Sequence, residues 1–267
     1  MSLTFFWHDY ETFGIDTRRD APAQFAGIRT DAELNELGEP VMLYCKPPRD
    51  ALPDPDACLL TGLTPQLCES RGLNEATFAQ RVLDELGHSG TIGVGYNSLG
   101  FDDEVTRHLF WRNLIDPYGR EWQNQCSRWD LFLVVRCAYA LRPEGIEWPL
   151  KDNGRPSLKL EHLSAANGLL HESAHDALSD VRATIGLARL LRQVLARKNQ
   201  ALAESDDVCT ALQLINFWQD LSVDLPRGRL YLPAEDLRAH GLDPANPAAW
   251  PGHARARELV AAECAWA

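Results

Sequence analysis

The sequence has 267 residues, and its 26 Lys and Arg against 38 Asp and Glu give a formal net charge of −12 at pH 7. This length fits one large domain or two small ones, and a 45% share of apolar residues is enough for a sizeable core. The acidic balance argues against a protein that holds nucleic acid through bulk positive charge. It does not exclude a nuclease, because nucleases need carboxylates to bind metal ions.

The sequence carries no targeting or membrane signal that we can identify. No apolar run approaches the ~18 residues that span a bilayer, and residues 1–9 lack a basic region followed by an apolar stretch. The 7 cysteines are scattered without a Cys-x-x-Cys pair, which favours reduced thiols over a zinc site or a disulfide framework. We therefore expect a cytoplasmic protein with no membrane partner.

The predicted elements, in chain order, begin with strands and continue mainly with helices. Alternating or short apolar runs predict strands over residues 4–13, 25–31, 41–46 and 91–96. Helical periodicity predicts helices over residues 75–86, 101–114, 128–141, 158–167 and 175–197. Strands first, then helices with a late returning strand, indicate a three-layer α/β domain with a mixed sheet.

The segment 105–142 departs from the acidic average. It contains six Arg against three acidic residues, interleaved with seven aromatic residues. Arginine beside stacking aromatics suits a groove for single-stranded nucleic acid. The alternative is that the aromatic side chains pack inward on two helices, which we expect of Phe110, Trp111 and Phe132.

Four carboxylates and one histidine form a candidate catalytic set. Asp9 and Glu11 lie two residues apart on the first predicted strand, so they share one face, where their repulsion would favour a bound cation. Asp102 opens the helix that follows the strand 91–96, and His175 and Asp180 lie at the start of the last long helix. Taken singly, the helix-start Asp suits an N-cap and the His a structural role. Their combination in this order indicates a metal-dependent site.

The segments around these residues resemble the DEDD exonuclease superfamily, histidine subtype. The three motifs are residues 8–14 (HDYETFG), 95–104 (GYNSLGFDDE) and 174–180 (AHDALSD). Residues 22–31, 44–47, 60–65, 127–131 and 139–146 are in addition similar to the bacterial exodeoxyribonuclease I family. The resemblance covers about residues 3–198 and implies a ribonuclease-H-like mixed sheet flanked by helices.

The resemblance implies a two-metal-ion 3′→5′ exodeoxyribonuclease that degrades single-stranded DNA to 5′-mononucleotides. Asp9, Glu11, Asp102 and Asp180 would hold two Mg²⁺ ions, with Mn²⁺ as a substitute. His175 would take the proton from the attacking water. The remaining implied partners are single-stranded DNA itself and, as a candidate, a single-stranded DNA-binding protein.

Candidate substrate-binding residues are less closely tied to the motifs. The residues expected to contact phosphates or bases are Arg107, Tyr118, Trp122, Arg128, Arg136 and Lys159. Those expected to line the pocket of the terminal nucleotide are Thr12, Phe13 and Leu60, and Glu11 is a substrate-binding candidate as well as a metal ligand. Lys159 stands where the family more often carries Arg, so it keeps the charge without the bidentate geometry. The neighbouring carboxylates Asp103 and Asp176 are expected to support the site or to face solvent.

The tail differs from the rest of the chain, because the resemblance to the exonucleases stops after Lys198. Residues from about 203 to 267 resemble a fragment of the squalene/phytoene synthase family, of the hydroxysqualene synthase type. On a predicted helix over 209–224, Asn216, Asp220 and Asp224 recur every four residues and share one face; the resemblance implies a vestigial diphosphate and metal motif. The alternative is a solvated face of an isolated helix.

We therefore expect an exonuclease domain over residues 1–198 and a truncated all-α segment over 199–267. The synthase family's first aspartate-rich motif has no counterpart in this sequence, so we expect no synthase activity. A functional isoprenoid synthase remnant is therefore the least favoured hypothesis.

Exodeoxyribonuclease I proteins continue with an SH3-like and a helical domain that close around DNA, so we expect weak processivity. The main alternative is a catalytically feeble DNA 3′-end binding module, and an RNA-directed exonuclease is a variant of the first reading. The tail should expose apolar surface and dock loosely.

Overall fold

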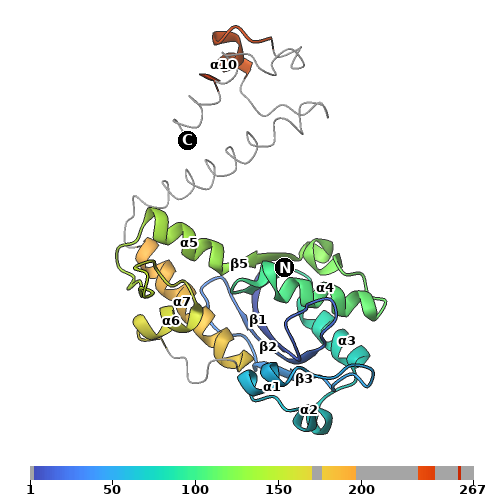
Figure 1. Cartoon of the computed structure of the whole chain (residues 1–267). Coiled ribbons are helices and arrows are strands. Elements are labelled where there is room, and N and C mark those ends of the chain that lie inside the picture. The colour runs from blue at the N-terminus through green and yellow to red at the C-terminus, as the bar shows by residue number, and fades with distance from the viewer. Residues whose placement is uncertain (1–2, 170–175, 197–233, 244–257, 260–267) are drawn as a thin grey trace. The chain divides into compact units, whose positions relative to one another are not determined.

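The computed structural model describes residues 3–169, 176–196, 234–243 and 258–259 (Figure 1). The chain divides into two compact units, Met1–Val194 and Leu195–Ala267. The described part of the second unit includes helix α10 (Ala234–Ala239); Asn216, Asp220 and Asp224 lie outside the described residues. Within the described ranges, no helix is both long and apolar enough to span a membrane.

The first unit is built on a five-stranded mixed sheet with the strand order β3-β2-β1-β4-β5. The strands are β1 (Thr4–Thr12), β2 (Pro22–Thr30), β3 (Val41–Tyr44), β4 (Thr91–Gly95) and β5 (Ser127–Asp130). The pairs β1–β2 and β2–β3 are antiparallel, whereas β1–β4 and β4–β5 are parallel. This mixed sheet with helices on both sides confirms the predicted fold class.

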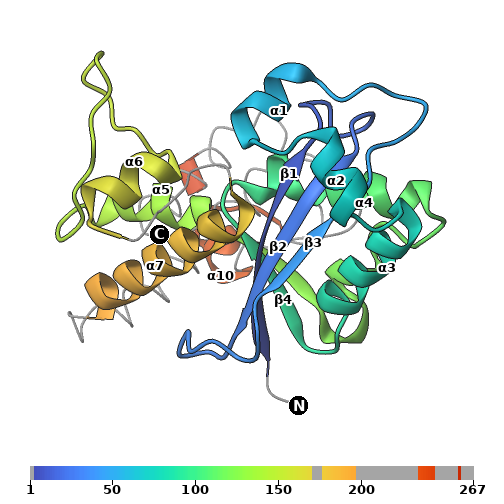
Figure 2. The ribbon, with the colours of Figure 1, turned by 90° about the horizontal axis from the view of Figure 1, so that it is seen from below.

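Helices cover both faces of the sheet, as Figure 2 shows. They are α1 (Pro55–Thr61), α2 (Pro65–Arg71), α3 (Glu75–Leu86), α4 (Asp102–Arg112), α5 (Leu131–Leu141), α6 (Leu160–Ala166) and α7 (Ala177–Ala196). Short 3₁₀ turns span Ser98–Gly100, Gly119–Glu121 and Gln123–Gln125.

Two apolar cores lie on opposite sides of the sheet, because the side chains of β1 alternate between its faces. Phe6 and Tyr10 pack with residues of α3 and α4, including Phe78 and Leu109. Trp7 packs on the other face with residues of α5 and α7. Odd-numbered residues of β1 therefore face α7, and the carboxylates of Asp9 and Glu11 lie on this face.

Two sequence-based expectations need correction, and two short helices were missed. The predicted helix over 128–141 is wrong at its start, because Ser127–Asp130 pairs with β4 as a strand and α5 begins at Leu131. Helices α1 and α2 were not predicted, although each begins with Pro and is capped, by Asp54 and Thr64 respectively. Trp111 is not a core residue, since it is 69% exposed, whereas its neighbour Phe110 is fully buried.

Candidate active site

Three carboxylates come together where β1 runs beside the first turn of α7. Asp9 and Glu11 project from β1 toward the face that α7 covers, and Asp180 is the fourth residue of α7. One carboxylate oxygen from each of these residues lies within 4.8 Å of the others. All three residues are partly exposed, so a ligand can approach the cluster.

Asp102 lies next to this cluster, and its charge acts on Asp9. It is the first residue of α4, it follows the carboxyl end of β4, and it is 3% exposed. Its Oδ1 atom accepts a hydrogen bond of 3.1 Å from the backbone N–H of Tyr10, the residue between Asp9 and Glu11. The structure therefore brings together Asp9, Glu11, Asp102 and Asp180, the four carboxylates singled out in the sequence.

The electrostatics of the cluster favour a bound cation. Burial, together with the charges of Asp102, Asp180 and Glu11, raises the pKa of Asp9 well above its ordinary value. Burial and the charge of Asp180 raise the pKa of Glu11 to about 8, and burial raises the pKa of Asp102 to about 7. Carboxylates that resist ionisation next to one another, with oxygen as the sole donor type, fit a hard divalent cation such as Mg²⁺.

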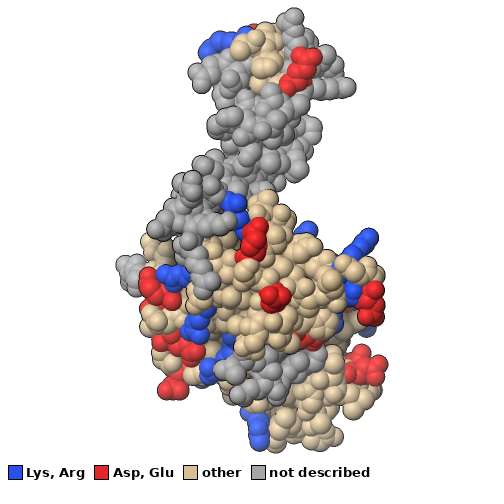
Figure 3. All heavy atoms as spheres, turned by 90° about the vertical axis from the view of Figure 1, so that its left-hand side faces the viewer, with Lys and Arg blue, Asp and Glu red and all other residues tan. Residues whose placement is uncertain are grey.

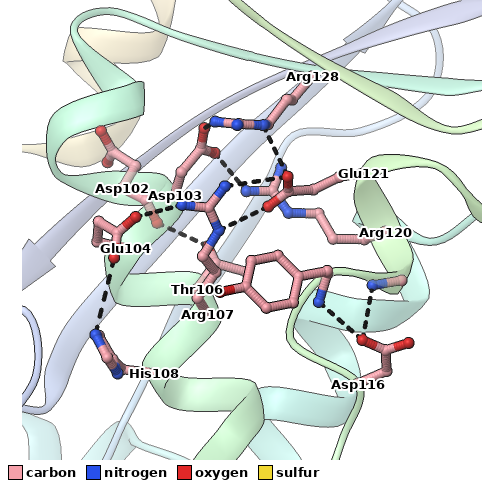
Figure 4. A network of polar contacts seen from close by, with 12 residues as sticks. Asp102, Asp103, Glu104, Thr106, Arg107, His108, Asp116, Arg120, Glu121 and Arg128 are labelled. Carbon is pink, nitrogen blue, oxygen red and sulfur yellow. Dashed lines mark hydrogen bonds and ion pairs between the residues drawn. The ribbon is translucent and has the colours of Figure 1, made fainter. Parts of the chain in front are cut away.

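A buried ion-pair network lies directly behind Asp102 (Figure 4). The Asp103 carboxylate, 2% exposed, accepts hydrogen bonds from Arg120 and, at 2.8 Å, from Arg128. Although burial acts to raise it, the charge of Arg120 leaves the pKa of Asp103 below its ordinary value. Burial and the same arginine lower the pKa of His8 to about 3, so that this buried imidazole is neutral. Asp103 thus anchors the first turn of α4, which carries Asp102.

The turn between β4 and α4 is fixed by a residue that the sequence did not reveal. Asp130, 3% exposed at the end of β5, accepts hydrogen bonds from the backbone N–H groups of Asn97, Leu99 and Phe132. It therefore caps α5 and holds the turn that leads to Asp102. An Asp at the junction of a strand and a helix is the usual signal for such a cap, but the signal was hidden because β5 was not predicted.

Comparison with known protein families agrees with this geometry. Residues 6–188 match the family model described as exonuclease. The chain belongs to the exonuclease family. Residues 178–267 match the squalene/phytoene synthase model, which covers the tail where the same resemblance was predicted and overlaps the end of the exonuclease match.

The relatives of this chain include proteins named exodeoxyribonuclease I and solved structures of exonuclease I. Exodeoxyribonuclease I of Escherichia coli K12 is 56% identical over 189 residues, which are 71% of this chain and 40% of the relative. The structure of a moderately thermophilic exonuclease I from Methylocaldum szegediense is similar with a TM-score of 0.69 and 61% identity, over 72% of this chain and 40% of that one. Escherichia coli exonuclease I in complex with a dA16 oligonucleotide gives a TM-score of 0.72 and 54% identity, over 73% and 42%. The chain thus spans about 40% of the length of these relatives.

The arginines of the segment 105–142 are largely paired within the fold. Arg107 contacts Glu104 and, at 2.8 Å, Glu121, and its guanidinium lies 5.1 Å from the ring centre of Tyr118. Arg128 contacts Asp103 and, at 2.9 Å, Glu121. On the face seen in Figure 3, basic side chains are likewise scattered among acidic ones rather than gathered in one patch.

Other predicted substrate-binding residues differ in their accessibility. Leu60, Tyr118 and Trp122 are 62%, 54% and 67% exposed. Arg136 is exposed on α5, and the Lys159 side chain is 66% exposed beside Glu161. Thr12 and Phe13 are buried, with Phe13 packed near Leu63 and Cys68. The candidate general base His175 lies outside the described residues.

Proposed function

We propose that this chain is a metal-dependent 3′→5′ exodeoxyribonuclease that releases 5′-mononucleotides from single-stranded DNA. The observation that carries the proposal is that carboxylate oxygens of Asp9, Glu11 and Asp180 lie within 4.8 Å of one another, in a chain of the exonuclease family. Asp102 accepts a hydrogen bond from the backbone of β1, the strand that carries Asp9 and Glu11. The relatives named exodeoxyribonuclease I, one of them in complex with a DNA oligonucleotide, support the choice of substrate.

The four carboxylates would hold two Mg²⁺ ions, for which Mn²⁺ can substitute. When bound, the ions stabilise the attacking and leaving oxygens of an in-line displacement at phosphorus. By its place in the third motif, His175 takes a proton from the attacking water, a role typically worth 10²–10⁴-fold in rate. The Asp103–Arg120 pair and the Asp130 cap keep Asp102 in place during this step.

Substrate contacts follow from exposure and chemistry. Tyr118 and Trp122 offer exposed rings on which bases can stack. Arg136 and Lys159 offer cationic groups for phosphates, and Leu60 offers an apolar edge near the terminal nucleotide. Arg107 and Arg128 would exchange part of their carboxylate contacts for phosphate, while buried Thr12 and Phe13 would back the nucleotide pocket.

Further parts of the proposal concern organisation and setting. Residues 1–198 form the catalytic domain, and residues 199–267, including Asn216, Asp220 and Asp224, confer no synthase activity. The chain acts in the cytoplasm, with a single-stranded DNA-binding protein as a candidate partner.

A 5′-labelled single-stranded DNA 30-mer tests the proposal. With Mg²⁺, the chain should shorten the labelled strand from its 3′ end and release 5′-mononucleotides, with slower action on duplex DNA and on RNA of the same sequence. Binding of the DNA end without shortening, even in single-turnover reactions, would identify an end-binding module instead. Faster degradation of the RNA would contradict the assignment to DNA.

A further inference from the structure

Gln24 connects the sheet to the helix that carries Asp180. It lies on β2, where its backbone pairs with Glu11 of β1, and it is 1% exposed. Its Oε1 atom accepts a hydrogen bond of 3.2 Å from the backbone N–H of Ala177. Its Nε2 atom donates to Oδ1 of Asp176 at 3.4 Å. Both ends of this buried amide are therefore used by the N-terminus of α7.

These contacts supply what the start of a helix lacks. The first N–H groups of a helix have no partner within it, and α7 begins at Ala177. The Oδ2 atom of Asp176 accepts from the backbone N–H of Ser179 at 3.3 Å, the usual geometry of an N-cap. Gln24 accepts a hydrogen bond from another of these N–H groups, that of Ala177, although Gln24 lies on β2. The N-terminus of α7 is therefore attached to β2 at the residue that pairs with Glu11.

The attachment fixes the position of Asp180. Asp180 follows Ala177 by three residues, which is about 4.5 Å along a helix axis, so it lies within the first turn from the attachment point. A neutral amide suits this position better than a cationic side chain, because a cationic side chain would compete with the metal ion for the carboxylates of Asp9 and Glu11. The Gln24 amide also donates to Oδ1 of Asp176, while the backbone N–H of Ser179 donates to Oδ2 of the same carboxylate. The charge of Asp176 contributes to the raised pKa values of Asp9 and Glu11.

We propose that Gln24 is a positioning residue that docks the first turn of α7 onto β2 and so holds Asp180 beside Asp9 and Glu11. This inference rests on the proposed metal-dependent function. Gln24 lies outside the three motifs and would contribute to metal affinity. Asp176 would be the N-cap of α7 through which Gln24 acts.

Calorimetric titration of the full chain with Mn²⁺ alone, without DNA, tests the proposal. Gln24→Met keeps the length of the side chain but removes both hydrogen bonds to the start of α7, together with a 3.6 Å contact to Sδ of Met42. We expect it to weaken Mn²⁺ binding by roughly 10–100-fold, as losses of residues that orient metal ligands do. The matched control is Thr30→Val at the far end of β2, which removes a buried hydrogen bond of 2.9 Å that the Thr30 hydroxyl accepts from Nε1 of Trp7 on β1. This control should lower the melting temperature and leave Mn²⁺ affinity unchanged.

Gln24→Asn gives a second reading, because its amide is one methylene shorter and cannot reach both partners. It should weaken Mn²⁺ binding in the same direction, and it decides the matter if Gln24→Met does not fold. Wild-type affinity in both folded Gln24 variants would overturn the inference, and so would an equal loss of affinity in Thr30→Val. Absence of Mn²⁺ binding in the wild-type chain would instead refute the proposed function.

Discussion

Glu11→Gln should stabilise the metal-free protein at alkaline pH, although it removes a proposed metal ligand. The pKa of Glu11 rises from 4.5 to about 8, chiefly through burial. Folding thus favours the protonated form, so the stability of the wild-type chain falls as the pH rises from the unfolded pKa through the folded pKa. At ~1.36 kcal/mol per pKa unit, the shift corresponds to at most about 5 kcal/mol.

The measurable gain should be smaller than this bound. Glu11 keeps some exposure to solvent, and the neighbouring carboxylates share the repulsion, so we expect roughly 1–3 kcal/mol at pH 9. The difference should shrink toward zero near pH 4.5, where the folded wild-type chain already holds the proton. With Mn²⁺ at pH 8 the order should reverse, because the ion stabilises the chain that retains its ligand.

Urea unfolding in EDTA, followed by tryptophan fluorescence from pH 5 to pH 9, measures this effect. The control is Glu69→Gln on α2, whose side chain is 51% exposed, and this surface change should alter the free energy of unfolding by less than about 0.5 kcal/mol. The reasoning is refuted if Glu11→Gln is less stable than the wild-type chain at pH 9, or if the difference does not shrink as the pH falls.

Two further predictions concern the ion-pair network and the aromatic surface. Arg120→Met should destabilise the protein by about 3–5 kcal/mol, because it leaves the buried carboxylate of Asp103 without its main partner; a loss below 1 kcal/mol in urea unfolding would contradict this. Trp122→Ala should weaken binding of single-stranded DNA by about 1–3 kcal/mol in a titration with EDTA, with unchanged stability. Trp111→Ala, also exposed, should bind DNA normally, and an equal loss in both variants would refute a specific contact.

The parts of the fold that follow from local pattern could be predicted. Alternation along 4–13 placed Asp9 and Glu11 on one face of a strand, and the observed β1 confirms this. The helical period over 75–86 matches α3. Both elements are set by the spacing of apolar residues that are near one another in the sequence, so their positions can be predicted without knowledge of the rest of the fold.

The parts that depend on distant partners could not be predicted. The strand Ser127–Asp130 exists because it pairs with β4, and its four residues carry too little pattern to separate it from the helix that follows. Arg107 looked available for DNA, but Glu121, 14 residues away, meets it in the fold. The amide of Gln24 reaches α7 across 153 residues of sequence, and the residues around Gln24 do not indicate this contact.

The account depends on metal-dependent hydrolysis at the carboxylate cluster. Its most direct test is the rate of mononucleotide release from single-stranded DNA by the wild-type and Asp9→Ala chains across a range of Mg²⁺ concentrations. The account predicts release by the wild-type chain that rises with Mg²⁺, stops with EDTA and returns with Mn²⁺, together with none from Asp9→Ala at any concentration. Equal release by both chains, or release that persists in EDTA, would contradict it.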